Sequence, residues 1–148
     1  LVGKTVAGMR MDDAIQATNW LAAEPSVDAG AIAVHGSGVM GPVALQAGIL
    51  DARVRRIILD SALASYRDIV EAPVSLDTPE TNLPGVLRQY DLPDLVAAMP
   101  PGAVVISSPV DSRGLALDDV RRQALFGRAG GVLSPSLFDP AQAAAYRP

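Results

Sequence analysis

The residues able to carry chemistry gather in one short turn, residues 35–41, which reads HGSGVMG. His35 is the only histidine in 148 residues and there is no cysteine. Any imidazole general base must therefore be His35. Without cysteine, and with one histidine, the sequence excludes thiol catalysis and a metal site built from histidines or thiolates. Ser37 supplies a hydroxyl in the same turn, and the carboxylates of Asp60 and Asp111 follow further along the chain.

The turn lies between a predicted strand and a predicted helix. Residues 31–34 (AIAV) are an apolar run that is too short for a buried helix and is followed at once by glycines, which predicts a buried strand. A helix is expected from Pro42, because proline is favoured at a first helical position. Residues 54–59 predict a second strand. Strand, turn, helix and strand form a βαβ unit with parallel strands, and in such sheets ligands bind beyond the carboxyl ends of the strands.

The rest of the chain repeats this alternation. We predict a helix over 10–23, a helix over 62–70, a surface loop over 71–82, two short helical pieces within 83–99, a strand over 103–107 and a helix over 117–126. The tail 127–148 is broken by glycine and proline, so we expect it to be weakly ordered, and only 141–146 is helical in pattern. Three strands with helices between them predict an α/β class, a three-layer αβα arrangement around a parallel sheet. We expect one domain over 1–148 with its core at about 10–126.

Composition narrows the classes of partner. The hydrophobic content of 49% is compatible with a packed core, and the net charge of −4 comes with acids and bases interspersed and no basic cluster. Nucleic acid and anionic membranes are therefore not expected as partners. No apolar run reaches the roughly 18 residues of a membrane span. Because the chain begins with Leu1 and three strands make a narrow sheet, we expect that an upstream part of the domain is missing.

One interpretation of the turn is a dinucleotide site. Residues 36–41 (GSGVMG) match G-x-G-x-x-G between a strand and a helix, and Asp60 follows nineteen residues after Gly41. A pyrophosphate would then lie against the helix N-terminus, with the Asp60 carboxylate on a ribose hydroxyl. Against this, the motif usually follows the first strand of its domain, whereas here a helix and a loop come first. Asp60 also fits a turn or helix-capping role for residues 61–64, which we favour.

A second interpretation is a nucleophile elbow, a sharp strand-to-helix turn that presents a nucleophile between small residues. Residues 3–36 (GKTVAGMRMDDAIQATNWLAAEPSVDAGAIAVHG), 42–68 (PVALQAGILDARVRRIILDSALASYRD) and 90–111 (YDLPDLVAAMPPGAVVISSPVD) resemble α/β-hydrolases of the acetyl xylan esterase-like group. The resemblance covers about residues 3–114. It implies an α/β-hydrolase-like partial domain, serine-dependent hydrolysis of acyl or acetyl esters, an ester or carbohydrate ligand and no cofactor.

The departures from the family pattern decide the expected activity. Aligned without gaps, the nucleophilic serine of the family falls on Gly38, which carries no nucleophile. Using Ser37 instead would require a shift of one residue. The backbone N–H of Val39 would belong to the oxyanion hole, and Asp111 falls on the position of the catalytic acid. No histidine follows His35, so we expect a pseudoenzyme whose ester hydrolysis is absent or very slow, since removing members of such a unit costs on the order of 10⁴ to 10⁶ in rate.

Several alternatives stay open at this point. Asp111 also fits a turn-forming aspartate, and His35 a hydrogen-bonded histidine at a strand end, since successive strand residues face opposite sides and His35 is not expected to serve Ser37. The chain could also be a non-catalytic companion domain that binds a partner. If Gly38 occupies the elbow, its φ should be positive, and Asp111 should follow a parallel strand at the same end of the sheet.

Overall fold

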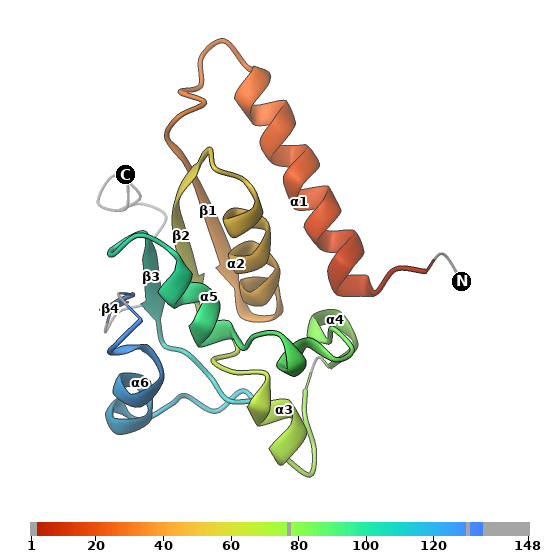
Figure 1. Cartoon of the computed structure of the whole chain (residues 1–148), viewed down its shortest axis with the longest axis vertical. Coiled ribbons are helices and arrows are strands. Elements are labelled where there is room, and N and C mark those ends of the chain that lie inside the picture. The colour runs from red at the N-terminus through yellow and green to blue at the C-terminus, as the bar shows by residue number, and fades with distance from the viewer. Residues whose placement is uncertain (1–2, 77, 130, 135–148) are drawn as a thin grey trace.

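The computed structural model describes residues 3–76, 78–129 and 131–134. Its centre is a sheet in the order β1-β2-β3-β4, in which every neighbouring pair is parallel. The strands are β1 (Ile32–Ser37), β2 (Val54–Asp60), β3 (Val104–Ser107) and β4 (Val132–Ser134). Helices lie alongside this sheet (Figure 1), and the result is the small three-layer α/β fold that the sequence predicts.

The helical elements are α1 (Val6–Ala23), η1 (Gly38–Met40), α2 (Gly41–Leu50), α3 (Arg67–Glu71), α4 (Thr78–Thr81), η2 (Val86–Arg88), α5 (Leu92–Ala98) and α6 (Asp119–Phe126). Helix α2 packs on β1 and β2 and lies between α1 and α5 (Figure 1). None of the helices described is both long and apolar enough to cross a membrane.

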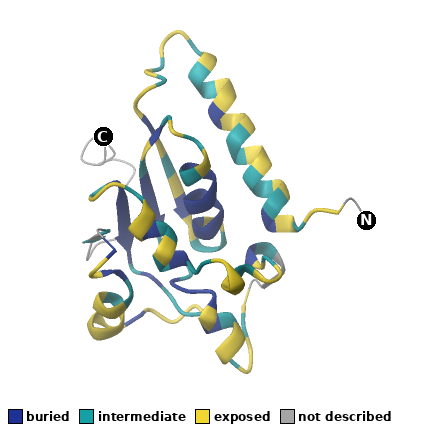
Figure 2. Cartoon of the chain, in the orientation of Figure 1, coloured by how far each residue is buried: buried dark blue, intermediate teal, exposed yellow. Residues whose placement is uncertain are grey.

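The core forms where α2 and α5 meet the sheet. Eight residues of α2, 41–48, are buried, whereas only Ala7 and Thr18 are buried in α1, so the dark colour of Figure 2 concentrates on α2 and the strands. Gly48 permits this close packing, because a Cβ there would lie 2.6 Å from the Cδ1 of Ile57. All of β3 and residues 57–59 of β2 are buried, and their consecutive apolar residues are typical of strand segments covered on both faces.

Helix α1 begins four residues earlier than the predicted start at residue 10. Thr5 supplies the reason, because its hydroxyl accepts a hydrogen bond from the backbone N–H of Gly8 at 3.0 Å and caps the first turn. The cap allows the weakly patterned residues 6–9 to join the helix.

The predicted helix over 62–70 is wrong in its first half, and only α3 is helical. Residues 62–64 are extended instead and pair with the loop after β3. Ala64 donates its N–H to the carbonyl of Val110, and Val110 donates to the carbonyl of Ala62, both at 2.9 Å. Tertiary pairing therefore overrides local helical preference here.

The tail departs from prediction as well. Strand β4 lies within the region that we expected to be weakly ordered, and it extends the sheet beyond the three predicted strands. The predicted helix at 141–146 lies outside the described residues. The predicted loop over 71–82 contains the short helix α4, and the two predicted helical pieces within 83–99 correspond to η2 and α5.

Candidate functional site at the strand ends

Gly38 occupies the sharp turn from β1 into the helical layer. It follows the last residue of β1, begins η1 and precedes α2 by three residues, and its φ of +53° confirms the predicted conformation. A side chain is disfavoured there by backbone strain rather than by lack of room, since a Cβ on Gly38 would meet nothing within 4 Å. The turn therefore has an elbow backbone with open space where a nucleophile would stand.

The other two glycines of the motif are fixed by packing. A Cβ on Gly36 would lie 2.5 Å from the Cβ of Ala44, and a Cβ on Gly41 would lie 2.2 Å from that of Ala62. Gly36 thus lets β1 approach α2, and Gly41 lets the loop after β2 pack against the start of α2. Backbone conformation at Gly38 and close packing at Gly36 and Gly41 therefore explain why glycine stands at all three positions, without a bound phosphate.

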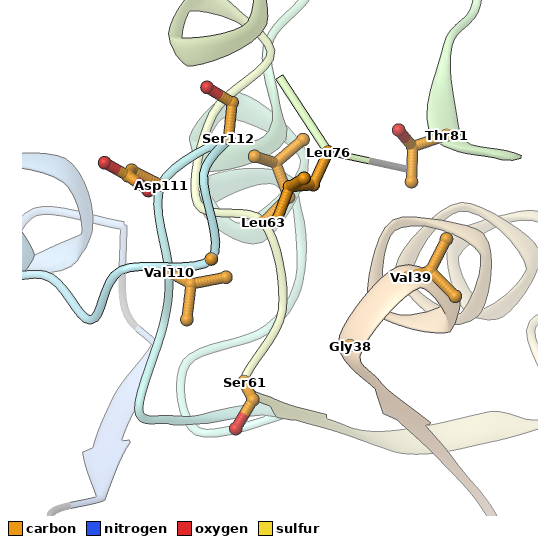
Figure 3. A pocket seen from close by; sticks show the side chains of 10 residues that line it. Gly38, Val39, Ser61, Leu63, Leu76, Thr81, Val110, Asp111 and Ser112 are labelled. Atoms are coloured by element: carbon orange, nitrogen blue, oxygen red, sulfur yellow. The ribbon is translucent and has the colours of Figure 1, made fainter. Parts of the chain in front are cut away.

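A cavity of about 190 Å³ lies in front of Gly38. Its walls come from the ends of β1, β2 and β3 and from the segment around α4, as Figure 3 shows. The lining residues are Gly38, Val39, Ser61, Leu63, Leu76, Thr81, Val110, Asp111, Ser112 and Gly114. Gly38, Val39 and Asp111 were expected at one site, and the structure brings them to this cavity.

Asp111 is used by its own turn. Its Oδ1 accepts hydrogen bonds from the backbone N–H groups of Arg113 at 2.9 Å and Leu115 at 3.0 Å, and its Oδ2 accepts from the Arg113 guanidinium at 3.1 and 3.2 Å. Burial raises the pKa of the Asp111 carboxyl, but these bonds to Leu115 and Arg113 outweigh burial and hold the pKa below its ordinary value. In Figure 3 the carboxylate points away from Gly38. In this structure Asp111 therefore acts as a turn-forming aspartate.

Asp60 ends β2 beside Ser37, with which it is paired across the two strands. Its Oδ1 accepts a hydrogen bond from the Ser61 hydroxyl at 3.2 Å, a local contact of the kind expected for a turn residue. Ser61 itself has a φ of +51°, and Ser108, directly after β3, has a φ of +46°. The residue that directly follows each of β1, β2 and β3 thus has a left-handed backbone. After β1 this residue is Gly38, which adopts the conformation without strain, whereas Ser61 and Ser108 are strained in it.

His35 and Ser37 are both exposed on β1. They stand two positions apart, so strand alternation puts them on the same face, and our expectation that they face opposite sides was wrong. Gly36 faces α2, because Ala44 would meet its Cβ. His35 and Ser37 therefore lie on the face directed away from α2.

A second cavity, of about 240 Å³, adjoins the first. Asp111 and Ser112 line both cavities, so their turn is a shared wall. Besides Asp111, the charged side chains that line the second cavity are Asp68, Glu71, Arg113 and Arg121. Figure 3 shows the oxygens of the turn directed away from Leu63 and Leu76.

Asp68 is the deepest charged group in that second cavity, with 4% of its side chain exposed. Its Oδ1 accepts from Arg121, and its carbonyl oxygen accepts from the Ser112 hydroxyl at 2.8 Å. Burial raises the pKa of Asp68 above its ordinary value, and Arg121 offsets only part of that effect. The sequence analysis missed both Asp68 and Arg121, because their 53-residue separation gives no local signal.

Asp91 holds the loop after β2 in place beside the cavities. It caps α5, and its carboxylate also accepts from the N–H of Tyr66 at 2.7 Å and from the hydroxyl of Ser65 at 2.5 Å. The Tyr66 hydroxyl accepts from the buried Gln46 of α2 at 2.7 Å. One carboxylate thus joins a helix start to the loop that carries Ser61 and Leu63.

No model of a known protein family and no curated protein matches the sequence. Within residues 3–76, 78–129 and 131–134, no group of three or more histidine, cysteine, aspartate or glutamate side chains could hold a metal ion.

Proposed function

We propose that this chain is an α/β-hydrolase-like domain, similar to the acetyl xylan esterase-like group, that does not hydrolyse esters and uses its strand-end cavity for binding. The observation that carries the proposal is the conformation of Gly38. Its positive φ at the strand-to-helix turn is that of an elbow residue, while glycine provides no nucleophile.

The surroundings of Gly38 also support the proposal that the chain does not hydrolyse esters. A serine hydrolase needs a base within hydrogen-bond reach of the nucleophile and a carboxylate that orients the base. Asp111 lies at the same end of the sheet as Gly38, yet its carboxylate oxygens already accept hydrogen bonds from Arg113 and Leu115. His35 lies on the face of β1 directed away from α2, so the cavity in front of Gly38 has no imidazole among its lining residues.

An assay with p-nitrophenyl acetate tests this proposal. We expect no turnover above the buffer rate for the unaltered chain, and none for Gly38→Ser, because a serine alone recovers neither base nor orienting acid. The matched variant is Ser37→Ala. Turnover that disappears in Ser37→Ala would overturn the proposal and identify Ser37 as the nucleophile.

The dinucleotide alternative draws less support from the geometry. The loop after β2 packs against the first residue of α2 through Ala62, and Asp60 is bonded to Ser61. We expect NAD to leave the melting temperature unchanged, since a ligand that binds the folded state raises it by mass action. A rise in melting temperature that is lost in Asp60→Ala would favour the dinucleotide site.

A further inference from the structure

We propose that the second cavity, which shares the turn of Asp111 and Ser112 with the strand-end cavity, binds a small organic cation with N–H donors, a primary alkylammonium ion. This cavity has a volume of about 240 Å³, and the shared turn separates it from the strand-end cavity. The inference therefore goes beyond the proposed function and does not depend on it.

Most of the charges that line this cavity are already paired. The Arg113 guanidinium bonds Oδ2 of Asp111 at 3.1 and 3.2 Å, and two backbone N–H groups of the turn bond Oδ1. Arg121 bonds Oδ1 of Asp68. Each of these ion pairs is neutral overall, so neither guanidinium is left to attract an anion.

Two carboxylate acceptors remain, and both belong to α3. Oδ2 of Asp68 is buried and has no hydrogen-bond partner among the described residues, and only 4% of the Asp68 side chain is exposed. Glu71 lies three residues later, on the same face of the helix, and takes part in none of the ion pairs within the described parts of the chain. Three carboxylates and two guanidinium groups line the cavity, which leaves one negative charge in excess.

A buried carboxylate oxygen without a donor costs free energy, and a ligand can offset that cost. Burial raises the pKa of the Asp68 carboxyl, because the charged form is poorly solvated there. A charged N–H donor suits such an oxygen, since charge-assisted hydrogen bonds are stronger than neutral ones. The Arg121 side chain is 45% exposed, so it can turn outward while the ligand nitrogen reaches Oδ2 of Asp68.

The kind of cation follows from the arrangement of the acceptors. No three histidine, cysteine, aspartate or glutamate side chains in the described parts of the chain are grouped as metal ligands. An ammonium group needs only three acceptors, one for each N–H. Asp68 and Glu71 supply two, and the Ser112 hydroxyl, which donates to the carbonyl of Asp68, retains lone pairs for the third. Figure 3 shows the Ser112 hydroxyl directed away from Leu63 and Leu76, and thus away from the strand-end cavity.

The uncharged lining and the volume set the size of the ligand. Ala72 and Pro73 add apolar surface, which removes an aliphatic stem from water. About 240 Å³ corresponds to roughly eight waters at about 30 Å³ each, so a propyl or butyl chain on the nitrogen fits. An ion of that size is expected to bind with a dissociation constant of about the millimolar range.

An NMR titration of the full chain with n-propylammonium chloride tests the site. Two comparison probes are 1-propanol, which has no charge, and tetramethylammonium chloride, which has a charge but no N–H donor, and sodium chloride keeps the ionic strength constant. We expect saturable shifts of the backbone amides of Glu71, Ser112 and Arg113 with n-propylammonium only. Equal shifts with either comparison probe, or none with n-propylammonium up to about 100 mM, would overturn the ligand class.

A matched pair of charge-removing variants locates the binding. Glu71→Gln should weaken the interaction roughly threefold to fivefold, the usual effect of an exposed charge pair. Glu24→Gln removes the same charge directly after α1, at the end of that helix far from α3 (Figure 1), and should leave the interaction unchanged. Equal weakening in both variants would show attraction by net charge alone and would overturn the site.

Asp68→Asn tests the buried oxygen. We expect binding to weaken at least about tenfold, more than in Glu71→Gln, because the lost charge is buried and its hydrogen bonds are charge-assisted. Weakening no greater than in Glu71→Gln would refute the role of Asp68. If Asp68→Asn fails to fold, the side-chain carboxyl carbon resonance of Asp68 in the unaltered chain decides. It should shift during the titration with n-propylammonium, and an unchanged resonance would refute the site.

Discussion

Gly41 and Ala62 lie so close that a Cβ on Gly41 would be 2.2 Å from the Cβ of Ala62. We expect Gly41→Ala to lower the free energy of unfolding by roughly 1–3 kcal/mol, the usual cost of overpacking a filled site. Ala62→Gly in the same chain should recover most of the loss, because it removes the opposing methyl group. Urea denaturation of the two single variants and the double variant measures the coupling. Gly30→Ala, with 3.4 Å to its nearest neighbour, is the control.

Gly38 should respond differently, because its restriction is conformational. Gly38→Ala is expected to cost about 1–2 kcal/mol through the left-handed backbone. Gly38→Asn should cost less, since asparagine tolerates that conformation, although its side chain is larger. Gly102, with a φ of +80° and open space around it, is a matched reference for both substitutions. A larger loss for Gly38→Asn than for Gly38→Ala would indicate a steric restriction instead.

The carboxylate of Asp111 should stabilise the fold in a pH-dependent way. Its pKa is lowered in the folded chain, so its contribution is present above about pH 4, the ordinary pKa of aspartate, and is lost as pH falls through the lower folded pKa. We expect Asp111→Asn to lower the free energy of unfolding by about 1–2 kcal/mol at pH 7. Denaturation series between neutral and acid pH should show the difference narrowing below about pH 4. A difference that stays constant with pH would contradict the ionic role.

The pair of Asp68 and Arg121 predicts the opposite dependence. Asp68 has a raised pKa in the folded chain, so its protonation adds stability that is present at low pH and lost as pH rises through the folded pKa. Arg121→Ala should cost roughly 1–3 kcal/mol at pH 7, less than the 3–5 kcal/mol of a fully buried pair, because Arg121 is 45% exposed. The loss should shrink on acidification.

A double variant isolates the charge of this pair. In an Asp68→Asn background the effect of Arg121→Ala should largely disappear, since no buried carboxylate is left without its partner. Thermal denaturation of all four chains forms the cycle. An equal loss in both backgrounds would assign the effect to packing of the arginine stem instead.

The sequence predicted the βαβ unit because its signals are local. The glycine turn, Pro42 and the apolar runs each restrict the backbone within a few residues, and the predicted strands at 31–34, 54–59 and 103–107 correspond to β1, β2 and β3. The positive φ of Gly38 was predictable for the same reason. Residues 62–64 were not, because their conformation depends on hydrogen bonds to Val110, more than forty residues away.

The site was predictable in its framework and not in its detail. The rule that ligands bind beyond the carboxyl ends of parallel strands placed Gly38 and Asp111 at one cavity. It gave no information on which way Asp111 would point. That orientation depends on the N–H groups of Arg113 and Leu115, which bond the carboxylate. The sequence could not decide it, because a tight turn follows the aspartate both when it is a catalytic acid and when it only forms the turn.

The occupied carboxylate of Asp111 has an evolutionary consequence. Two of the four glycine codons become serine codons by a single-nucleotide change, so from those codons a hydroxyl at position 38 is one mutation away. Under the proposed function that mutation would bring strain without activity, because Asp111, the proposed acid, is bonded within its own turn and the one histidine of the chain, His35, lies on the face of β1 directed away from α2. If the domain descends from a hydrolase, as we propose, each further step back toward hydrolysis would break hydrogen bonds that now stabilise the fold. On that proposal, selection meets no intermediate that gains activity on the way back to a hydrolase, and a lineage with this turn can instead be refined for binding.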